Sequence, residues 1–480
     1  MKKILIAGIA ALISAAAFAQ VGAPYIHDPS TIMESNGKYF TFGTGTNGLM
    51  SEDGWNWHSG AIRPHSGAAP DAIKIGDRYL VGFSSTGGGL GGGHAGNILT
   101  MWNETLDPSD PRFKYTDPIV VAESNVDEDC DAIDIGLFLD PVTGRLFCTF
   151  GTYFGEIRQC ELDPKTGARL EGTKDIPVAI DCEASDMIYN DGWYYLLGTH
   201  GTCCDGTNST YNIVCGRSRN VNGPFLDELG RDMYRGGGKM VVAAEQRRVG
   251  AGHFGREIID KGVEKCSFHW EADFDLSGRS TLAIRPLVWK NGWPVAAELL
   301  EDGIYSIISE RRGYALELSV DFIRLNGGMR GFFMRQDEAV VSVEDQKLED
   351  VIGGWPEGNI EVRAMDNMFR PNQKWEIKAV PEAGGYLGGP YCKIVISGTN
   401  RALAATADKE IVTVPEFTGA PEQLWRIEML TDGTYRIMPK EVPGCDEELV
   451  LISIADTKPT LGKYDFNNVN CKWNLKSLKY

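Results

Sequence analysis

Four acidic residues in the first 200 positions have the type and spacing needed for hydrolytic chemistry. Asp28, Asp134 and Glu183 each lie 9 or 10 residues before a glycine that opens a short strand, and Asp71 lies 5 residues before another. A single aspartate in a turn usually hydrogen-bonds the backbone. Three acids at equivalent positions of a repeat instead favour one shared site.

Three carboxylates around one pocket suit the hydrolysis of a glycosidic bond. An inverting enzyme uses one ionised carboxylate to activate water and one protonated carboxyl, about 6.5–9.5 Å away, to protonate the leaving oxygen. The acid must keep its proton near neutral pH, which burial or a nearby negative charge achieves. The sequence contains no Gly-x-Ser-x-Gly motif for a competing serine nucleophile.

The strands that must position these acids form a repeat. Copies of a turn glycine followed by a strand begin at Gly37, Gly76, Gly144 and Gly192, and a fainter fifth begins at Gly278. The irregular spacing suits propeller blades with inserted loops. One blade cannot bury both of its faces, so the blades must pack radially. We therefore predict an all-β, five-bladed β-propeller whose innermost strands bring the acids to a central pocket.

A second repeat begins near Glu301. Gln-x-Trp, or Cys-x-Trp in the last copy, recurs at spacings of 50 and 48 residues and places Trp375, Trp425 and Trp473. These units resemble the ricin-type β-trefoil, which implies a carbohydrate-binding domain at about residues 300–480. Of the stretches that match its sugar-binding positions, 315–318 and 402–405, the second has no polar side chain. This disfavours sugar binding through that lobe.

Length and charge narrow the function further. A chain of 480 residues is too long for a single core, so we predict two domains, 20–298 for the propeller and 299–480 for the trefoil. The net charge of −19 disfavours nucleic acid and anionic membranes as partners. A neutral polysaccharide or oligosaccharide carries no such penalty. We expect a monomer that uses no organic cofactor.

The N-terminus has the three parts of a secretory signal peptide. Lys2 and Lys3 precede a short apolar run, and a small-residue cleavage signal ends at Ala19. We predict that residues 1–19 are removed and that the protein is secreted or periplasmic, with no lipobox-like cysteine after the signal. The sequence has 11 cysteines, so at least one lacks an intramolecular partner, and the absence of Cys-x-x-Cys disfavours a structural zinc site.

Several motifs together resemble glycoside hydrolase family 43, and the downstream ones resemble its arabinanase branch. The resemblance covers nearly all of residues 24–296. The catalytic-region motifs are His27-Asp28-Pro29-Ser30, Ala69-Pro70-Asp71, Ala132-Ile133-Asp134 and Cys182-Glu183-Ala184. The arabinanase-like run comprises Cys203-Cys204-Asp205-Gly206, Ser209-Thr210-Tyr211-Asn212-Ile213, Gly216-Arg217-Ser218 and Gly223-Pro224-Phe225, followed by Gly252-His253 and Ile284-Arg285-Pro286-Leu287.

The resemblance implies roles for individual residues. It assigns Asp28 as general base and Glu183 as general acid, and Asp134 as the residue that raises the pKa of Glu183 and orients it. It implies that Asp71 contacts the sugar. It also implies that His253 helps to hold a cation, usually calcium, at the propeller axis, although Ala251 stands where the arabinanase pattern has Pro.

Two further segments are interpreted as parts of the pocket. Cys203-Cys204 and Ser209-Thr210-Tyr211 belong to the arabinanase-like run and could form the wall of the catalytic pocket or pack within a blade. We favour the wall, with Cys203 and Ser209 contacting the sugar. The glycine-rich stretch 87–93 lacks Gly-Lys-Ser/Thr and no helix pattern comes after it, so it is interpreted as a flexible loop at the pocket mouth and not as a phosphate loop.

The leading hypothesis is an inverting hydrolase of α-L-arabinofuranosyl linkages, most directly an endo-acting enzyme on α-1,5-arabinan. An exo-acting arabinofuranosidase is one alternative, and a β-xylosidase or exo-galactanase of the same family is another. A secreted, non-catalytic carbohydrate-binding protein is an alternative of a different class. The presence of all three acids favours the enzyme, because a lectin would bind sugar equally well without them.

Overall fold

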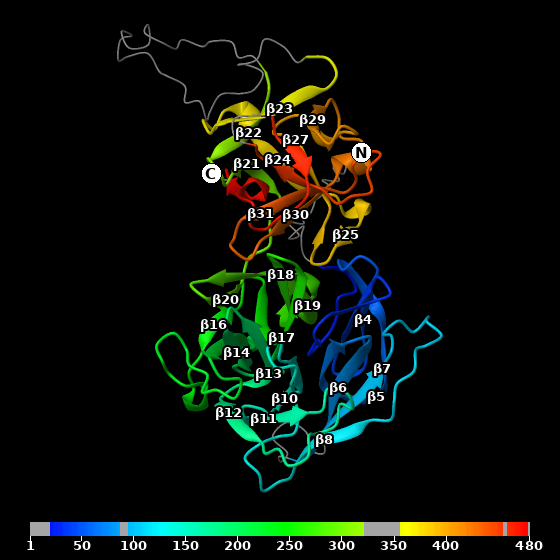
Figure 1. Cartoon of the computed structure of the whole chain (residues 1–480), viewed down its shortest axis with the longest axis vertical. Coiled ribbons are helices and arrows are strands. Elements are labelled where there is room, and N and C mark those ends of the chain that lie inside the picture. Colours follow the sequence, from blue (N-terminus) through cyan, green and yellow to red (C-terminus); the bar gives the residue numbers. More distant parts are fainter. Residues whose placement is uncertain (1–19, 87–94, 321–355, 455–457, 479–480) are drawn as a thin grey trace, which may run out of the picture.

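The computed structural model describes residues 20–86, 95–320, 356–454 and 458–478. The predicted signal peptide and the glycine-rich stretch 87–93 lie outside these residues. Within them the chain is built of strands, short 3-10 helices and turns, which confirms the all-β prediction. Figure 1 shows the N-terminal strands in the lower part of the molecule and the C-terminal strands above them. No helix among the described residues is long and apolar enough to cross a membrane.

The N-terminal strands form five blades, antiparallel except for β1 (Val21–Gly22), which pairs parallel with β5 (Asn56–Ile75). The first two share β5, whose residues up to Gly67 pair with β4 and whose later residues pair with β6. Blade 1 contains β5 together with β1 (Val21–Gly22), β2 (Met33–Ser35), β3 (Lys38–Phe42) and β4 (Gly45–Ser51). Blade 2 contains β5 together with β6 (Arg78–Thr86), β7 (Gly96–Asn103) and β8 (Ile119–Ser124).

Blades 3 to 5 each form a separate four-stranded sheet. Blade 3 contains β9 (Gly136–Leu139), β10 (Leu146–Phe150), β11 (Glu156–Leu162) and β12 (Ile176–Ile180). Blade 4 contains β13 (Glu183–Asn190), β14 (Trp193–His200), β15 (Asn212–Ser218) and β16 (Lys239–Val242). Blade 5 contains β17 (Arg248–Asp260), β18 (Val263–Asp273), β19 (Arg279–Lys290) and β20 (Trp293–Ala296). Short 3-10 helices lie in the connecting loops at Gly206–Asn208, Met233–Arg235 and Phe274–Leu276.

The repeat locates four of the five inner hairpins correctly, but the copy expected at Gly278 is wrong. Gly278 lies between β18 and β19, whereas the inner hairpin of blade 5 turns at Gly262, between β17 and β18. Both glycines have positive φ values, so both suit tight turns. The strand after Gly262 begins Val-Glu-Lys-Cys-Ser, without the aromatic residues that mark the other copies. The aromatic pattern therefore does not mark the inner hairpin of blade 5, the last blade of the propeller.

The C-terminal strands build a second core around three equivalent units. Trp375, Trp425 and Trp473 are fully buried in one apolar cluster. Each indole Nε1 donates a hydrogen bond of 2.8–3.0 Å to a backbone carbonyl, those of Leu316, Leu403 and Leu451 respectively. Each tryptophan also comes after a 3-10 helix, at Pro371–Gln373, Pro421–Gln423 and Val469–Cys471. The Gln-x-Trp repeat thus reports a structural repeat, and its assignment to the β-trefoil stays a prediction.

Most of the C-terminal strands belong to one ten-stranded sheet. Its members are β21 (Gly303–Ser309), β22 (Tyr314–Leu318), β23 (Ile360–Asp366), β24 (Trp375–Ala379), β27 (Cys392–Ile396), β28 (Ala402–Ala405), β29 (Ile411–Val414), β30 (Trp425–Met429), β31 (Tyr435–Pro439) and β34 (Trp473–Ser477). Two small hairpins complete it, β25 (Gly385–Tyr386) with β26 (Gly389–Pro390) and β32 (Val450–Ile452) with β33 (Thr460–Gly462). A further 3-10 helix spans Pro381–Ala383.

The stretches that match the trefoil's sugar-binding positions are buried. Glu317 in β22 accepts hydrogen bonds from Arg363 and Gln373, and all four residues of β28 are buried. Neither stretch therefore presents a free polar side chain to a sugar.

The hairpin β25–β26 packs on the seam where the first and last blades meet. Leu387 lies in one apolar cluster with residues of blade 1, such as Trp57, and of blade 5, such as Ile284. The Leu387 carbonyl accepts a hydrogen bond from the buried Lys265 of β18, and Gly388 N donates to Gly54 O at 3.0 Å. The C-terminal strands thus contact both sides of the ring closure (Figure 1).

Replacing Leu387 with Ala is expected to lower the free energy of unfolding by about 2–3 kcal/mol, because the side chain is 2% exposed and its removal leaves a cavity in the seam. Urea unfolding followed by tryptophan fluorescence measures the change. Leu229→Ala is the matched control, since Leu229 is 90% exposed and should change stability by less than about 0.5 kcal/mol. Equal unfolding midpoints for the two variants would show that the hairpin does not stabilise the seam.

Candidate active site

One residue at the mouth of each blade adopts a left-handed backbone conformation. Their φ values lie between 40° and 62°, and they are Asp28, Ala69, Asp134, Ala184 and His253. The backbone N–H of each residue donates a hydrogen bond to a side chain of the preceding blade. The donor–acceptor pairs are Asp28 to His269, Ala69 to Thr44, Asp134 to Ser84, Ala184 to Asp134 and His253 to Thr199. Non-glycine residues rarely adopt this conformation, and such strain clusters at functional sites. Three of the five carry predicted site side chains.

Glu183 precedes Ala184, one of these five residues, and is a strongly perturbed acid. It begins β13 and is 6% exposed. Burial raises the pKa of Glu183 far above its ordinary value, and the charges of Asp134 and Asp28 raise it further. Burial and the charge of Asp28 also raise the pKa of Asp134, whose Oδ2 accepts a hydrogen bond of 3.0 Å from Ala184 N. Glu183 and Asp134 therefore titrate as a pair, and Glu183 holds its proton at neutral pH.

Asp28 is held in the opposite protonation state. Burial acts to raise the pKa of Asp28, but His27, His269, His253 and the hydrogen bond from Thr44 outweigh it, so the pKa is lowered. Thr44 Oγ1 donates to Asp28 Oδ2 at 2.6 Å. Nitrogen atoms of His27, His253 and His269 lie 3.5–3.9 Å from Asp28 Oδ1. The carboxylate is thus ionised and oriented.

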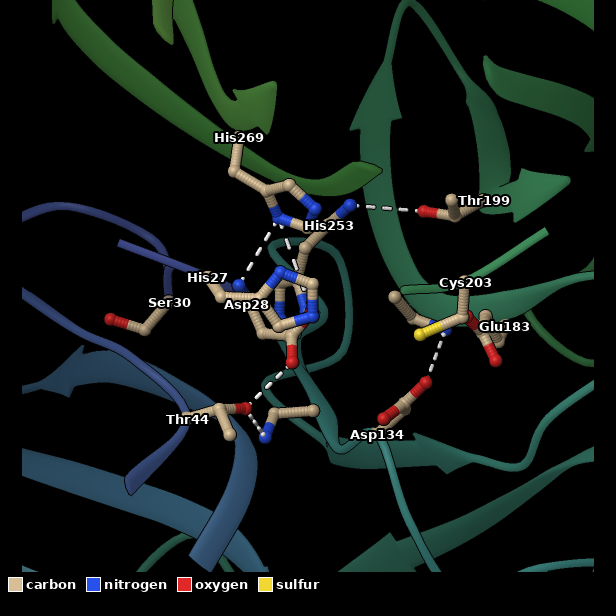
Figure 2. Close-up of polar contacts among 12 residues, drawn as sticks. His27, Asp28, Ser30, Thr44, Asp134, Glu183, Thr199, Cys203, His253 and His269 are labelled. Atoms are coloured by element: carbon tan, nitrogen blue, oxygen red, sulfur yellow. Dashed lines mark hydrogen bonds and ion pairs between the residues drawn. The ribbon is translucent and has the colours of Figure 1, made fainter. Parts of the chain in front are cut away.

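The two carboxyl groups form a complementary acid and base. Figure 2 shows Asp28 among the histidines on one side of the pocket and Asp134, Glu183 and Cys203 on the other. Environments that push two carboxyl pKa values apart are typical of an acid–base pair. The arrangement can deprotonate a water molecule at Asp28 and protonate a departing oxygen at Glu183.

Tyr211 is the residue that holds Glu183 directly. Its buried phenol donates a hydrogen bond to Glu183 Oε1. The sequence placed Tyr211 only in a wall or packing segment, because its partner Glu183 lies 28 residues earlier, at the start of β13. Ser209, predicted to line the sugar wall, is buried, accepts from Tyr211 N at 3.2 Å and donates to Thr202 O at 3.2 Å. These contacts hold the turn that carries Tyr211.

Asp71 differs from its predicted position against the sugar. Its side chain is 4% exposed, and its two oxygens accept hydrogen bonds from Thr31 N at 3.0 Å and Leu137 N at 2.9 Å. Burial raises the pKa of Asp71 to about 6 despite these bonds. Asp71 therefore ties blades 1, 2 and 3 together, and its contact with the sugar stays a prediction.

The histidines around Asp28 were largely missed from the sequence, although a signal existed. Thr44 and Thr199 each lie seven residues after the turn glycine of their blade. Thr44 hydrogen-bonds Asp28, and Thr199 hydrogen-bonds the backbone of His253. His269 lies seven residues after Gly262, and His253 lies nine before it. Placing the fifth repeat at Gly262 would have predicted both histidines as ring residues.

The side chains around His253, where the resemblance implies a cation, offer mostly nitrogen ligands. His27, Asp28 and His269 could together hold a metal ion, and His253 Nδ1 is buried without a hydrogen-bond partner. Burial lowers the pKa of His253 to about 4, which keeps its imidazole neutral and able to bind a metal. Calcium takes six to eight oxygen ligands, and this set offers one carboxylate. The side chains alone therefore do not fit calcium.

Comparison with known proteins identifies the N-terminal part. Residues 27–294 match the sequence profile of glycosyl hydrolases family 43, which is more than half of the chain. This chain belongs to glycosyl hydrolase family 43. The predicted glycoside hydrolase and its five-bladed propeller are thereby confirmed. All the residues of the acid–base site lie within the matched segment.

The relatives of this family 43 enzyme are arabinan-degrading proteins by name. It is 28% identical to the extracellular exo-α-(1→5)-L-arabinofuranosidase of Cellvibrio japonicus over 60% of this chain and 89% of that one. It is also 28% identical to the extracellular endo-α-(1→5)-L-arabinanase 1 of Bacillus subtilis, over 58% and 90% of the chains. The Cellvibrio cellulosa α-L-arabinanase structure with arabinohexaose matches with a TM-score of 0.53 at 26% identity, covering 58% and 96%.

Proposed function

We propose that this family 43 enzyme hydrolyses α-L-arabinofuranosyl linkages of plant polysaccharide, with α-1,5-arabinan as its substrate, and inverts the anomeric centre. The observation that carries the proposal is the pairing of an ionised Asp28 with a protonated Glu183 in one pocket. Asp28 deprotonates the attacking water and Glu183 protonates the leaving oxygen. Asp134 raises the pKa of Glu183 and, through Ala184 N, fixes the start of β13.

The extracellular relatives and the N-terminal pattern support a secreted or periplasmic location. We propose in addition that the protein is a monomer. Relatives of both endo and exo action match, so we propose the endo mode as the first to test and the exo mode as its alternative.

Product analysis tests the substrate and the mode together. The full-length protein is incubated with linear α-1,5-arabinan and short arabino-oligosaccharides, and the products are separated by chromatography. A ladder of oligomers supports an endo-arabinanase, and arabinose alone supports an exo-acting enzyme. No product from either substrate would exclude linear arabinan and direct the test to branched arabinan, xylan and galactan. Sugar binding without turnover on any of these would support a lectin.

Replacing Asp134 with Asn is expected to move the alkaline limb of the kcat/KM profile to lower pH and to reduce kcat by about a hundredfold. Burial raises the pKa of Glu183 first and the charge of Asp134 next, so removing that charge lets Glu183 lose its proton at lower pH. Asn keeps an oxygen for Ala184 N. The acidic limb, set by Asp28, is the internal control and should not move. An unchanged alkaline limb would remove Asp134 as the modulator.

A further inference from the structure

Four residues that can bind a metal gather beside the base, on the opposite side of His27 from the propeller axis site. They are His27, Cys203, Cys204 and Glu271, and one ligand atom of each lies within 4.8 Å of all the others. They come from the segment before β2, the loop between β14 and β15, and β18. Cys203 and Cys204 are joined as a disulfide, so in this state the sulfur atoms are not free to bind a metal.

Glu271 is already positioned as a ligand. Its side chain is 4% exposed, and Oε1 accepts a hydrogen bond of 3.2 Å from Cys204 N and lies 3.8 Å from His27 Nδ1. These contacts hold the carboxylate against the cysteine pair. Cys204 itself is exposed, which leaves an approach from solvent.

Reduction converts the pair into strong ligands. A dithiol reductant transfers two electrons and two protons to the S–S bond, giving two thiols, and itself becomes a cyclic disulfide. A divalent cation then displaces the two thiol protons to bind thiolates. Two thiolates, one imidazole and one carboxylate make a four-coordinate set of the kind that zinc takes, with ligands about 2.0–2.3 Å from the metal. Thiolates select soft cations such as zinc and cadmium over calcium.

We propose that reduction of Cys203–Cys204 opens a site for a thiophilic divalent cation, formed by His27, Cys203, Cys204 and Glu271, that inhibits the hydrolase. His27 Nε2 lies 3.5 Å from Asp28 Oδ1, so a metal that binds His27 draws it away from the base. Figure 2 shows Cys203 on the same side of the pocket as Glu183 and Asp134, so a metal bound there would also hinder the substrate. The cation-binding step goes beyond the proposed function and does not depend on the substrate.

Cadmium alone, added to the full-length protein, tests the binding step. The protein is compared as purified and after treatment with a dithiol that is then removed without air. The expected result is a thiolate-to-cadmium charge-transfer band in the ultraviolet that saturates at one equivalent in the reduced protein and is absent before reduction. Glu271→Gln should weaken cadmium binding at least about tenfold, since it removes one ligand charge.

The remaining thiols supply the controls. Eight of the other nine cysteines are buried, and Cys445 alone among them is partly exposed. Cys445→Ser should therefore keep the band, and the double variant Cys203→Ser/Cys204→Ser should lose it. A band that survives in the double variant, or that is equal before and after reduction, would overturn the proposal. If the double variant does not fold, the comparison of the two redox states in Cys445→Ser decides alone.

Activity gives a second, independent readout. Zinc should slow hydrolysis of the substrate identified by the product analysis only after reduction, and a chelator followed by reoxidation should restore the rate. Cadmium binding without any loss of rate would overturn the inhibitory part. If the protein does not hydrolyse arabinan, the cadmium-binding test can still be carried out, because it needs no substrate. A wrong substrate and a wrong metal site are therefore distinguished.

Discussion

Replacing Glu183 with Gln is expected to lower the rate on arabinan by about two to four orders of magnitude, while the rate on an aryl arabinofuranoside with an acidic phenol as leaving group stays within about tenfold of wild type. An alkoxide leaves only with a proton, and Glu183 is the buried acid that holds one. A nitrophenolate leaves without that proton. Gln is similar in shape and keeps an oxygen for the Tyr211 hydroxyl.

The comparison of the two substrates separates loss of acid catalysis from loss of folding. Glu382→Gln, on an exposed 3-10 helix of the C-terminal part, is the matched control and should leave both rates unchanged. Equal losses on both substrates with Glu183→Gln would remove Glu183 as the general acid.

Replacing Asp28 with Asn is expected to reduce both rates together, by about two to four orders of magnitude, because activation of water is needed whatever group leaves. The amide cannot accept a proton near neutral pH, although its oxygen can keep the hydrogen bond from Thr44. Steady-state kinetics on arabinan and on the aryl substrate measure this. Substantial retained activity on the aryl substrate alone would assign Asp28 to the leaving-group side and reverse the proposed roles.

The three acids of the candidate site could be located from the sequence because the fold repeats. Asp28, Asp134 and Glu183 keep nearly the same distance to a turn glycine, and a propeller turns equal distances along the chain into neighbouring positions around one axis. The aromatic strands between them are buried on both faces, as in β10, so their pattern was strong.

The remaining site residues depend on contacts between blades or between distant segments of one blade, which the spacing of the repeat does not report. Tyr211, just before β15, reaches Glu183 at the start of β13 in the same blade, and Asp71 accepts hydrogen bonds from amides of two other blades. His269 sits at a repeat position, but its blade lacks the aromatic signature, so the repeat was placed 16 residues too late. The physical reason is that blade 5 is packed partly by the C-terminal strands, through residues such as Lys265.

The packing of the β25–β26 hairpin limits how freely the propeller can be separated from the C-terminal strands. A shortened enzyme ending at the predicted boundary, residue 298, would expose Trp57 and Ile284 where Leu387 now covers them, and would leave Lys265 without Leu387 and Glu428. The C-terminal strands are therefore part of the architecture that closes the ring, whether or not they bind sugar. Engineering of this hydrolase by domain exchange should carry the hairpin along with the propeller, as an integral component and not as a detachable accessory.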